Sequence, residues 1–369
     1  MVEAYGMSNR DPEYLRKAND GTPEYNPVVL KSFRKLQIRT SIYETPPERG
    51  SGLRLAIYQA EANWGPGVLA RNLERLADAI EKAADHGSQL LVFPELYLSG
   101  YTLDPDEAQA TSEPASGPAI SACQDLASKY GIALLVPYGE KTESGGKTQC
   151  FDSIAVIHES GKLLDSYKKT HLYGQQERDN WTPGISDFPV HNIHDFPVGV
   201  LNCYECEFPE LVRILALKGA KLVVGPTAAD SYYRLPDGTR SKVPYPDVAK
   251  VVFPAHAWCN NLFFAYANRC GFEERDGEVW HYRGNSIVYG PHGDVMVEAA
   301  HEQDTLLIAD CVPAYYGMTH PAPNYFYLKD RRPELYGMLT SNDASFLNVT
   351  GKDLNEQTDL FSGRYHYGA

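Results

Sequence analysis

Three segments of the 369-residue chain place a chemically reactive residue directly after an apolar run. Glu95 follows LLVFP, Lys169 follows the short run SYK, and Cys203 follows GVLN. Apolar runs of this kind predict buried strands, and a rigid scaffold commonly presents its functional groups where strands end. Taken singly, the three are ordinary: a solvated glutamate, a surface lysine and a small buried cysteine. Their conjunction indicates a site.

A thiol, an ammonium and a carboxylate together could carry out nucleophilic catalysis at a carbonyl carbon. A helix is predicted to begin near Pro209, so Cys203 would lie at its start, where free N–H groups and Lys169 would lower the pKa of the thiol. Lys169 could also stabilise the oxyanion that forms on attack. Glu95 could accept the thiol proton, donate it to departing ammonia and then activate water. Such a site needs neither a histidine nor a metal.

Short strands alternating with a few helices are expected to position these groups. Helical periodicity covers residues 69–84, and helices are also expected near 119–130, 209–218 and 247–260. Strand patterns occur at 55–58, 90–93, 132–136, 153–157, 198–202, 221–224, 262–267, 286–289 and 305–308. This mixture predicts layered sheets with helices outside. We expect a catalytic domain over 52–312, an N-terminal extension over 1–51 and a C-terminal extension over 313–369 that serves subunit contacts.

The motifs FPE ending at Glu95, KKTHL around Lys169 and CYECEFPE from Cys203 resemble the Glu–Lys–Cys triad motifs of the carbon–nitrogen hydrolase (nitrilase) superfamily. The resemblance spans about residues 54–311. It implies an α/β fold, a four-layer α-β-β-α sandwich, with no cofactor or metal and with assembly as a homodimer or a higher homo-oligomer. It also maps a second glutamate, which would orient Lys169 and the substrate, onto Glu140. The backbone N–H of Tyr204 would be the second oxyanion donor.

Within the superfamily, the segment after the nucleophile is similar to the CYDxEFPE of bacterial aliphatic and stereoselective amidases, whereas nitrilases tend to have Cys-Trp-Glu there. The loop GPTAA at 225–229 matches a pocket-lining loop of relatives. Thr227 and Ala228 in this loop, and Tyr101 after the first motif, are therefore the predicted substrate contacts.

One segment departs from the family pattern. Relatives usually have Arg-Ala-x-Glu-Asn before the last inner strand, whereas this chain has His256 and Cys259 at the two charged positions. The change removes a plausible ion pair and puts the local packing, or a subunit contact, in doubt.

The resemblance implies hydrolysis of a small carboxamide to a carboxylic acid and ammonia through a thioester at Cys203. The alternative within the family is an N-carbamoyl-amine or N-carbamoyl-amino-acid hydrolase, or a nitrilase, with the same triad. An N-carbamoyl acid calls for a cation at its carboxylate, for which Arg234, Arg240 and His256 are the candidates. A redox function of the Cys203–Cys206 pair and a catalytically silent interaction protein are less favoured interpretations.

The composition limits the kinds of partner that the protein is expected to bind. The formal charge of −14 repels phosphate backbones, so nucleic acid is not expected to bind. The chain shows no signal-peptide pattern and no apolar run of about 20 residues, so neither secretion nor a membrane is expected. Seven cysteines spread over the chain do not form a disulfide framework. We expect a cytoplasmic enzyme whose partner is a small-molecule amide.

Overall fold

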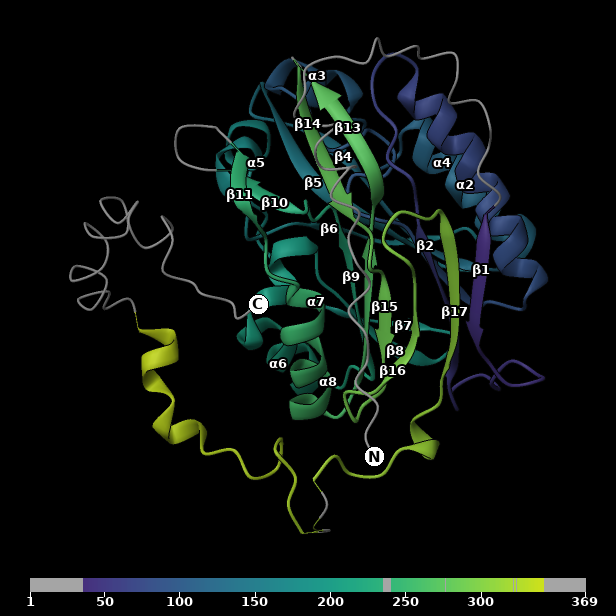
Figure 1. Cartoon of the computed structure of the whole chain (residues 1–369), viewed down its shortest axis with the longest axis vertical. Helices are drawn as coiled ribbons and strands as arrows, with labels where there is room; N and C mark the ends of the chain where they lie inside the picture. The colour runs from purple at the N-terminus through teal and green to yellow at the C-terminus, as the bar shows by residue number, and fades with distance from the viewer. Residues whose placement is uncertain (1–35, 235–239, 276, 321, 323, 342–369) are drawn as a thin grey trace. The chain divides into compact units, whose positions relative to one another are not determined.

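The computed structural model describes residues 36–234, 240–275, 277–320, 322 and 324–341, and every statement below concerns this part of the chain (Figure 1). Residues 1–35 of the predicted N-terminal extension and 342–369 of the predicted C-terminal extension lie outside the described residues.

The first sheet has seven strands in the order β1-β17-β2-β3-β4-β5-β6. Their bounds are β1 Gln37–Ser41, β2 Leu53–Gln59, β3 Leu90–Val92, β4 Ala133–Ser144, β5 Lys147–Ile157, β6 Leu163–Lys168 and β17 Thr305–Cys311. Strands β2, β3 and β4 run parallel, and β5 and β6 follow antiparallel. Strand β1 pairs in parallel with β17, so the sheet begins within the segment that was predicted to be an irregular extension.

The second sheet has six strands in the order β16-β15-β12-β9-β8-β7. Their bounds are β7 Val190–Ile193, β8 Phe196–Val200, β9 Leu222–Thr227, β12 Phe263–Asn268, β15 Ile287–Tyr289 and β16 Val295–Glu298. Strand β9 lies in parallel between β8 and β12. Two antiparallel ribbons accompany the sheets, formed by β10 Tyr232–Arg234 with β11 Arg240–Pro244 and by β13 Cys270–Arg275 with β14 Glu278–Arg283.

Alternating side chains join the layers. In β2, Leu53, Leu55 and Ile57 belong to the core between the sheets, together with side chains of β8 and β9. The intervening Ala56 and Tyr58 pack with side chains of helices α2 (Val68–Asp85) and α4 (Pro118–Tyr130). This period of two is what a strand buried on both faces requires.

The outer face of the second sheet packs against α6 (Pro209–Leu217), α7 (Val248–Val251) and α8 (Phe253–Asn260). The predicted α-β-β-α sandwich is therefore confirmed. The predicted single helix over 247–260 is divided in two, and Pro254, which lacks a backbone N–H, lies in the first turn of the second part.

Short helices complete the described chain. They are α3 Pro105–Thr111, α5 Gly174–Asn180 and the 3-10 helices η1 Cys203–Glu207, η2 Pro313–Tyr315, η3 Pro333–Leu335 and η4 Gly337–Thr340. Asp104 caps α3 in a capping box with Glu107, which satisfies the first N–H groups of that helix. None of the described helices has the length and apolar character that a membrane crossing requires.

Candidate active site

The three predicted residues come together where strands of both sheets end. Glu95 follows β3 and Lys169 follows β6 in the first sheet, while Cys203 follows β8 in the second. The Nζ atom of Lys169 lies 2.6 Å from Oε1 of Glu95, and both side chains are fully buried. Cys203 is partly exposed and interacts electrostatically with both of them. The three groups therefore lie near one another, and their catalytic roles stay a prediction.

Lys169 is surrounded by carboxylates. Besides Glu95, its ammonium lies 2.8 Å from Glu177 and 3.7 Å from Asp152. Burial alone would lower the pKa of Lys169, but Glu177 and Glu95 raise it well above its ordinary value. Oxygens of the three carboxylates lie within 4.8 Å of one another, a spacing that suits a cation, and the ammonium of Lys169 is the cation they surround.

Cys203 begins η1 in a left-handed conformation, with φ of 52°. A residue other than glycine is strained there by about 1–3 kcal/mol, and such strain gathers at functional sites. Burial, followed by the charge of Glu95, raises the pKa of the thiol well above its ordinary value, although Lys169 opposes the shift. The expected lowering of the thiol pKa was wrong, because desolvation and two neighbouring carboxylates outweigh the ammonium and the helix start. The thiol is therefore protonated at neutral pH.

Glu205 ties the cysteine segment to the lysine segment. Its Oε1 accepts hydrogen bonds from the N–H and hydroxyl of Thr170, at 2.7 and 2.5 Å. Its Oε2 accepts from the hydroxyl of Tyr167 and the N–H of Asn202, at 2.7 and 2.8 Å. Although burial opposes it, these hydrogen bonds lower the pKa of Glu205, so the buried carboxylate stays charged. Sequence reasoning assigned no role to this residue.

Arg269 and Glu273 form a second support beneath the site. The Arg269 guanidinium donates to the backbone oxygen of Glu95 at 2.9 and 2.8 Å and pairs with Glu273 at 2.7 Å. Glu273 in turn accepts from the N–H groups of Tyr101 and Thr102. The pair therefore fixes the loop that follows β3. Sequence reasoning assigned no role to Arg269 or to Glu273.

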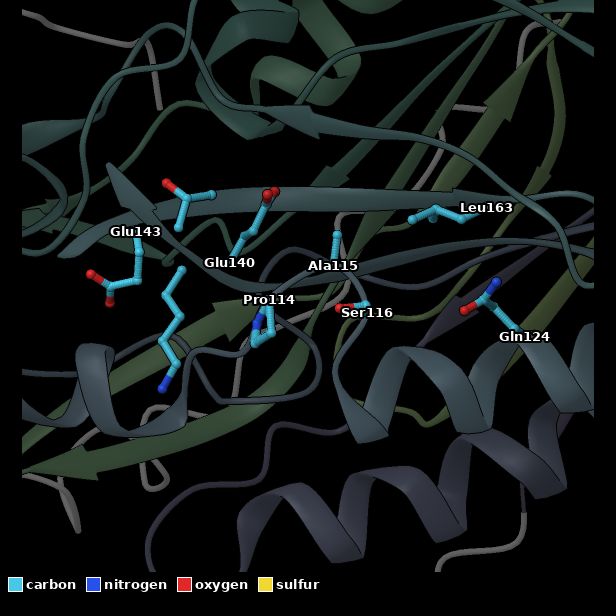
Figure 2. Close-up of a pocket in the computed structure, with 9 residues that line it drawn as sticks. Pro114, Ala115, Ser116, Gln124, Glu140, Glu143 and Leu163 are labelled. Carbon is cyan, nitrogen blue, oxygen red and sulfur yellow. The ribbon is translucent and has the colours of Figure 1, made fainter. Parts of the chain in front are cut away.

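Glu140 lies away from Lys169, which corrects its expected role. Its carboxylate pairs with Lys168 at 2.9 Å and accepts from the hydroxyl of Ser166 at 2.6 Å. It also lines a separate open cavity of about 700 Å³ between β4 and the segments near α4 (Figure 2), where none of the three triad residues is a lining residue. The carboxylate that orients Lys169 is Glu177, eight residues further along the chain and in α5.

The predicted substrate contacts all lie beside this centre. The Tyr101 hydroxyl donates to Glu177 at 2.7 Å. Thr227 accepts the N–H of Glu95 through its backbone oxygen at 3.3 Å, and its side chain opposes the rise in the pKa of the Cys203 thiol. Ala228 is buried in the same apolar cluster as Tyr101. Whether the three touch substrate stays a prediction.

The candidate carboxylate-binding cations are less well placed. The side chain of Arg234 lies outside the described residues. The guanidinium of Arg240 stacks on the ring of Tyr232 at 4.9 Å. His256 packs in α8 near the rings of Phe253 and Phe264, and burial lowers its pKa, so it is neutral at neutral pH.

Cys206, the other cysteine of the CxxC spacing, is buried in the apolar cluster beneath α6 and α8. Neither it nor Cys203 is in a disulfide. This placement favours Cys206 as a packing residue.

The sandwich brings a cysteine, a buried lysine and three carboxylates together where its strands end. The carbon-nitrogen hydrolase family model matches residues 54–320, and the chain belongs to this family. It is accordingly a hydrolase of carbon–nitrogen bonds other than peptide bonds, as the motifs predicted.

Several known proteins are similar to this chain. A hydrolase encoded in the pqqF 5′ region of Pseudomonas protegens is 34% identical and covers 78% of this chain and 92% of its own. A citrullinase of Francisella tularensis is 31% identical, covering 78% and 97%. The structure is similar to that of a variant amidase from Nesterenkonia sp. AN1, with 30% identity, a TM-score of 0.61 and coverage of 80% and 99%. That amidase carries the acetamide moiety of fluoroacetamide on its active-site cysteine.

Proposed function

We propose that this protein hydrolyses a small carboxamide to a carboxylic acid and ammonia through a thioester at Cys203. One observation carries the proposal. Oε1 of Glu95 is held by Lys169, whereas its buried Oε2 has no hydrogen-bond partner in the described part of the chain. A buried carboxylate oxygen beside a protonated thiol is suited to accept a proton.

In the first half-reaction, Cys203 Sγ attacks the amide carbon as Glu95 accepts the thiol proton. The negative charge that develops on the amide oxygen is stabilised by the ammonium of Lys169 and by the backbone N–H of Tyr204 in the first turn of η1. The tetrahedral adduct then breaks its carbon–nitrogen bond. Glu95 returns the proton to the leaving nitrogen, ammonia departs, and the acyl group remains on sulfur as a thioester.

In the second half-reaction, Glu95 takes a proton from a water molecule that attacks the thioester carbon. The carbon–sulfur bond breaks, the carboxylic acid leaves, and the proton returns to sulfur. Glu177 keeps Lys169 in place through both steps by its 2.8 Å contact, and its own position is fixed by the hydroxyl of Tyr101.

A ureido compound is the second candidate substrate, because the citrullinase of Francisella tularensis matches nearly its whole length. The same triad would attack the carbamoyl carbon, and the first products would be ammonia or an amine with a carbamoyl thioester. Hydrolysis of that thioester releases carbon dioxide, which an amide substrate does not yield.

The test is a panel of aliphatic, aromatic and amino-acid amides, nitriles and N-carbamoyl compounds, with release of ammonia and carbon dioxide measured. Amide turnover that disappears in Cys203→Ala, with iodoacetamide labelling lost at the same residue, is expected. Silence across the amides would overturn the proposal, and carbon dioxide release from ureido compounds alone would favour the second candidate.

We further propose that copies of this chain associate through the exposed apolar side chains of α6 and of the segment after β17. These are Ile214, Leu217, Tyr315, Met318, Leu335, Met338 and Leu339. The molar mass from light scattering tests this: a monomer at micromolar concentration would contradict it. Cytoplasmic location stays a prediction.

A further inference from the structure

Glu207 is a half-buried carboxylate four residues after the cysteine, at the last position of η1. It makes no hydrogen bond or ion pair with the described residues, unlike Glu205 two positions earlier, which accepts several. A half-buried carboxylate without a protein partner is available to bind a group from outside the chain, such as a cation with N–H donors.

The surroundings of Glu207 are those of the nucleophile. Three tyrosines, Tyr173, Tyr245 and Tyr266, interact electrostatically with both Glu207 and Cys203. The same three tyrosines are therefore near both the carboxylate and the thiol. Glu207 also interacts electrostatically with the buried Cys206 and with the ammonium of Lys169.

Lys169 does not neutralise Glu207, since its ammonium is in contact with Glu95 and Glu177 at 2.6 and 2.8 Å. Burial raises the pKa of Glu207 to about 7, against the opposing charge of Lys169. A free cation with N–H donors would complete this arrangement, because it would supply the missing hydrogen bond and favour the charged carboxylate. The faces of the tyrosine rings attract a cation as well.

We propose that Glu207 is a specificity-determining residue that binds a protonated amine of the substrate, so that the preferred amide carries an ammonium group on its acyl part. This inference rests on the proposed function, since it concerns the acyl group attached to Cys203. It also accounts for the anionic character of the site, which disfavours acyl groups that carry a carboxylate.

The first experiment compares two amides of the same length, 4-aminobutyramide and pentanamide, at pH 8. Wild-type protein is expected to have the larger kcat/KM for the amino amide. Glu207→Gln should lower that ratio about tenfold to a hundredfold, mainly through KM, because one charge-assisted hydrogen bond is lost. Glu210→Gln, which changes an exposed glutamate three residues later, is the matched control and should leave the ratio unchanged.

The ratio should also depend on pH. Since Glu207 ionises near pH 7, the preference for the amino amide should rise between pH 6 and pH 8, where the substrate amine stays protonated. In Glu207→Gln the ratio should be flat over this range. A purely structural role of Glu207 would change both amides equally and would not alter the pH profile of the ratio.

A second measurement does not depend on turnover. Each amide is used to protect Cys203 from iodoacetamide, and wild-type protein should be protected at about tenfold lower concentrations of the amino amide, an advantage that Glu207→Gln loses. Equal protection by both amides, or a wild-type preference for pentanamide, would overturn the inference. Silence of both amides in the ammonia assay together with selective protection would instead contradict the proposed hydrolysis and support the cation subsite.

Discussion

Two buried cations support this site, and they are neutralised differently. Arg269 has one carboxylate, Glu273, at 2.7 Å, and its other donors bind backbone oxygens, including that of Glu95. Lys169 has two carboxylates in direct contact and a third, Asp152, at 3.7 Å. Around Lys169, Oε2 of Glu95 and Oδ2 of Asp152 have no hydrogen-bond partner among the described residues.

This difference distinguishes a structural ion pair, Arg269 with Glu273, from a cluster around Lys169 that can exchange protons. A one-to-one pair whose hydrogen bonds are all made holds the backbone and has no remaining capacity to exchange protons. A cation with surplus carboxylates is different: burial, together with the charge of Glu95, raises the pKa of both Asp152 and Glu177, so these groups take up a proton more readily than ordinary carboxylates. After burial, the negative charges of Glu95 and Glu177 also raise the pKa of the Cys203 thiol.

The largest expected effect on catalysis comes from Glu95→Gln. Without the general base, amide hydrolysis should fall about 10²–10⁴-fold. Because the charge of Glu95 helps to raise the pKa of Cys203, alkylation of the thiol by iodoacetamide at pH 8 should be at least as fast as in the wild type. Mass spectrometry of the labelled peptide measures it, with Cys203→Ala as the unlabelled control. Slower alkylation would contradict this expectation, because it would show that Glu95 promotes ionisation of the thiol more than its charge opposes it.

Arg269→Met should be the most destabilising of these changes. It leaves Glu273 buried without a cation, which costs about 3–5 kcal/mol. Glu95→Gln should cost less, since Lys169 keeps Glu177. Urea denaturation measures both free energies of unfolding. Arg54→Met is the matched control, because Arg54 forms a comparable buried pair with Asp310 at 2.7 Å, away from the triad residues.

The two arginine variants should differ in activity. Both should lose stability, but only Arg269→Met should lower kcat of the folded fraction, since Arg269 holds the backbone of Glu95. Equal kcat values in the two variants would show that the loop after β3 keeps its position without the Arg269 brace.

Much of the fold was readable from local pattern. The apolar run of β2 and the helical spacing of Leu76, Ile80 and Ala83 depend only on which side chains are buried, and the sequence shows this directly. The ribbon of β13 and β14 and the edge strand β1 escaped prediction. Their residues are partly exposed, so polar and apolar positions do not alternate clearly.

Only the site residues that lie in recognisable sequence motifs could be predicted. Glu95, Lys169 and Cys203 come together as expected, whereas Glu140 was taken for the carboxylate that Glu177 provides. Glu177 lies in the polar segment GQQERDN, which gives no sign of burial, and only the three-dimensional path of α5 brings it back to Lys169. The left-handed backbone of Cys203 is likewise set by tertiary contacts and has no signature in a non-glycine residue.

Glu177→Gln should lower kcat about tenfold to a hundredfold, since it weakens one of the two direct contacts of Lys169 and small displacements of a catalytic group are costly. Tyr101 can still donate to the amide oxygen, so the fold should persist. Steady-state kinetics measure the loss and circular dichroism verifies the fold. Unchanged kcat would mean that Glu95 alone positions the lysine.

The smallest effect is expected from Glu140→Gln. Its comparison with Glu177→Gln tests which of the two glutamates orients Lys169. Glu140 pairs with Lys168, whose side chain is 29% exposed, and a glutamine can still accept from Ser166. The loss in stability should be about 1 kcal/mol, and kcat should stay within about threefold of the wild type because Lys169 keeps all its contacts. If Glu140→Gln lowered kcat as much as Glu177→Gln, Glu140 would act on the substrate itself. Without such a loss, the orienting role belongs to Glu177, whose carboxylate faces the ammonium.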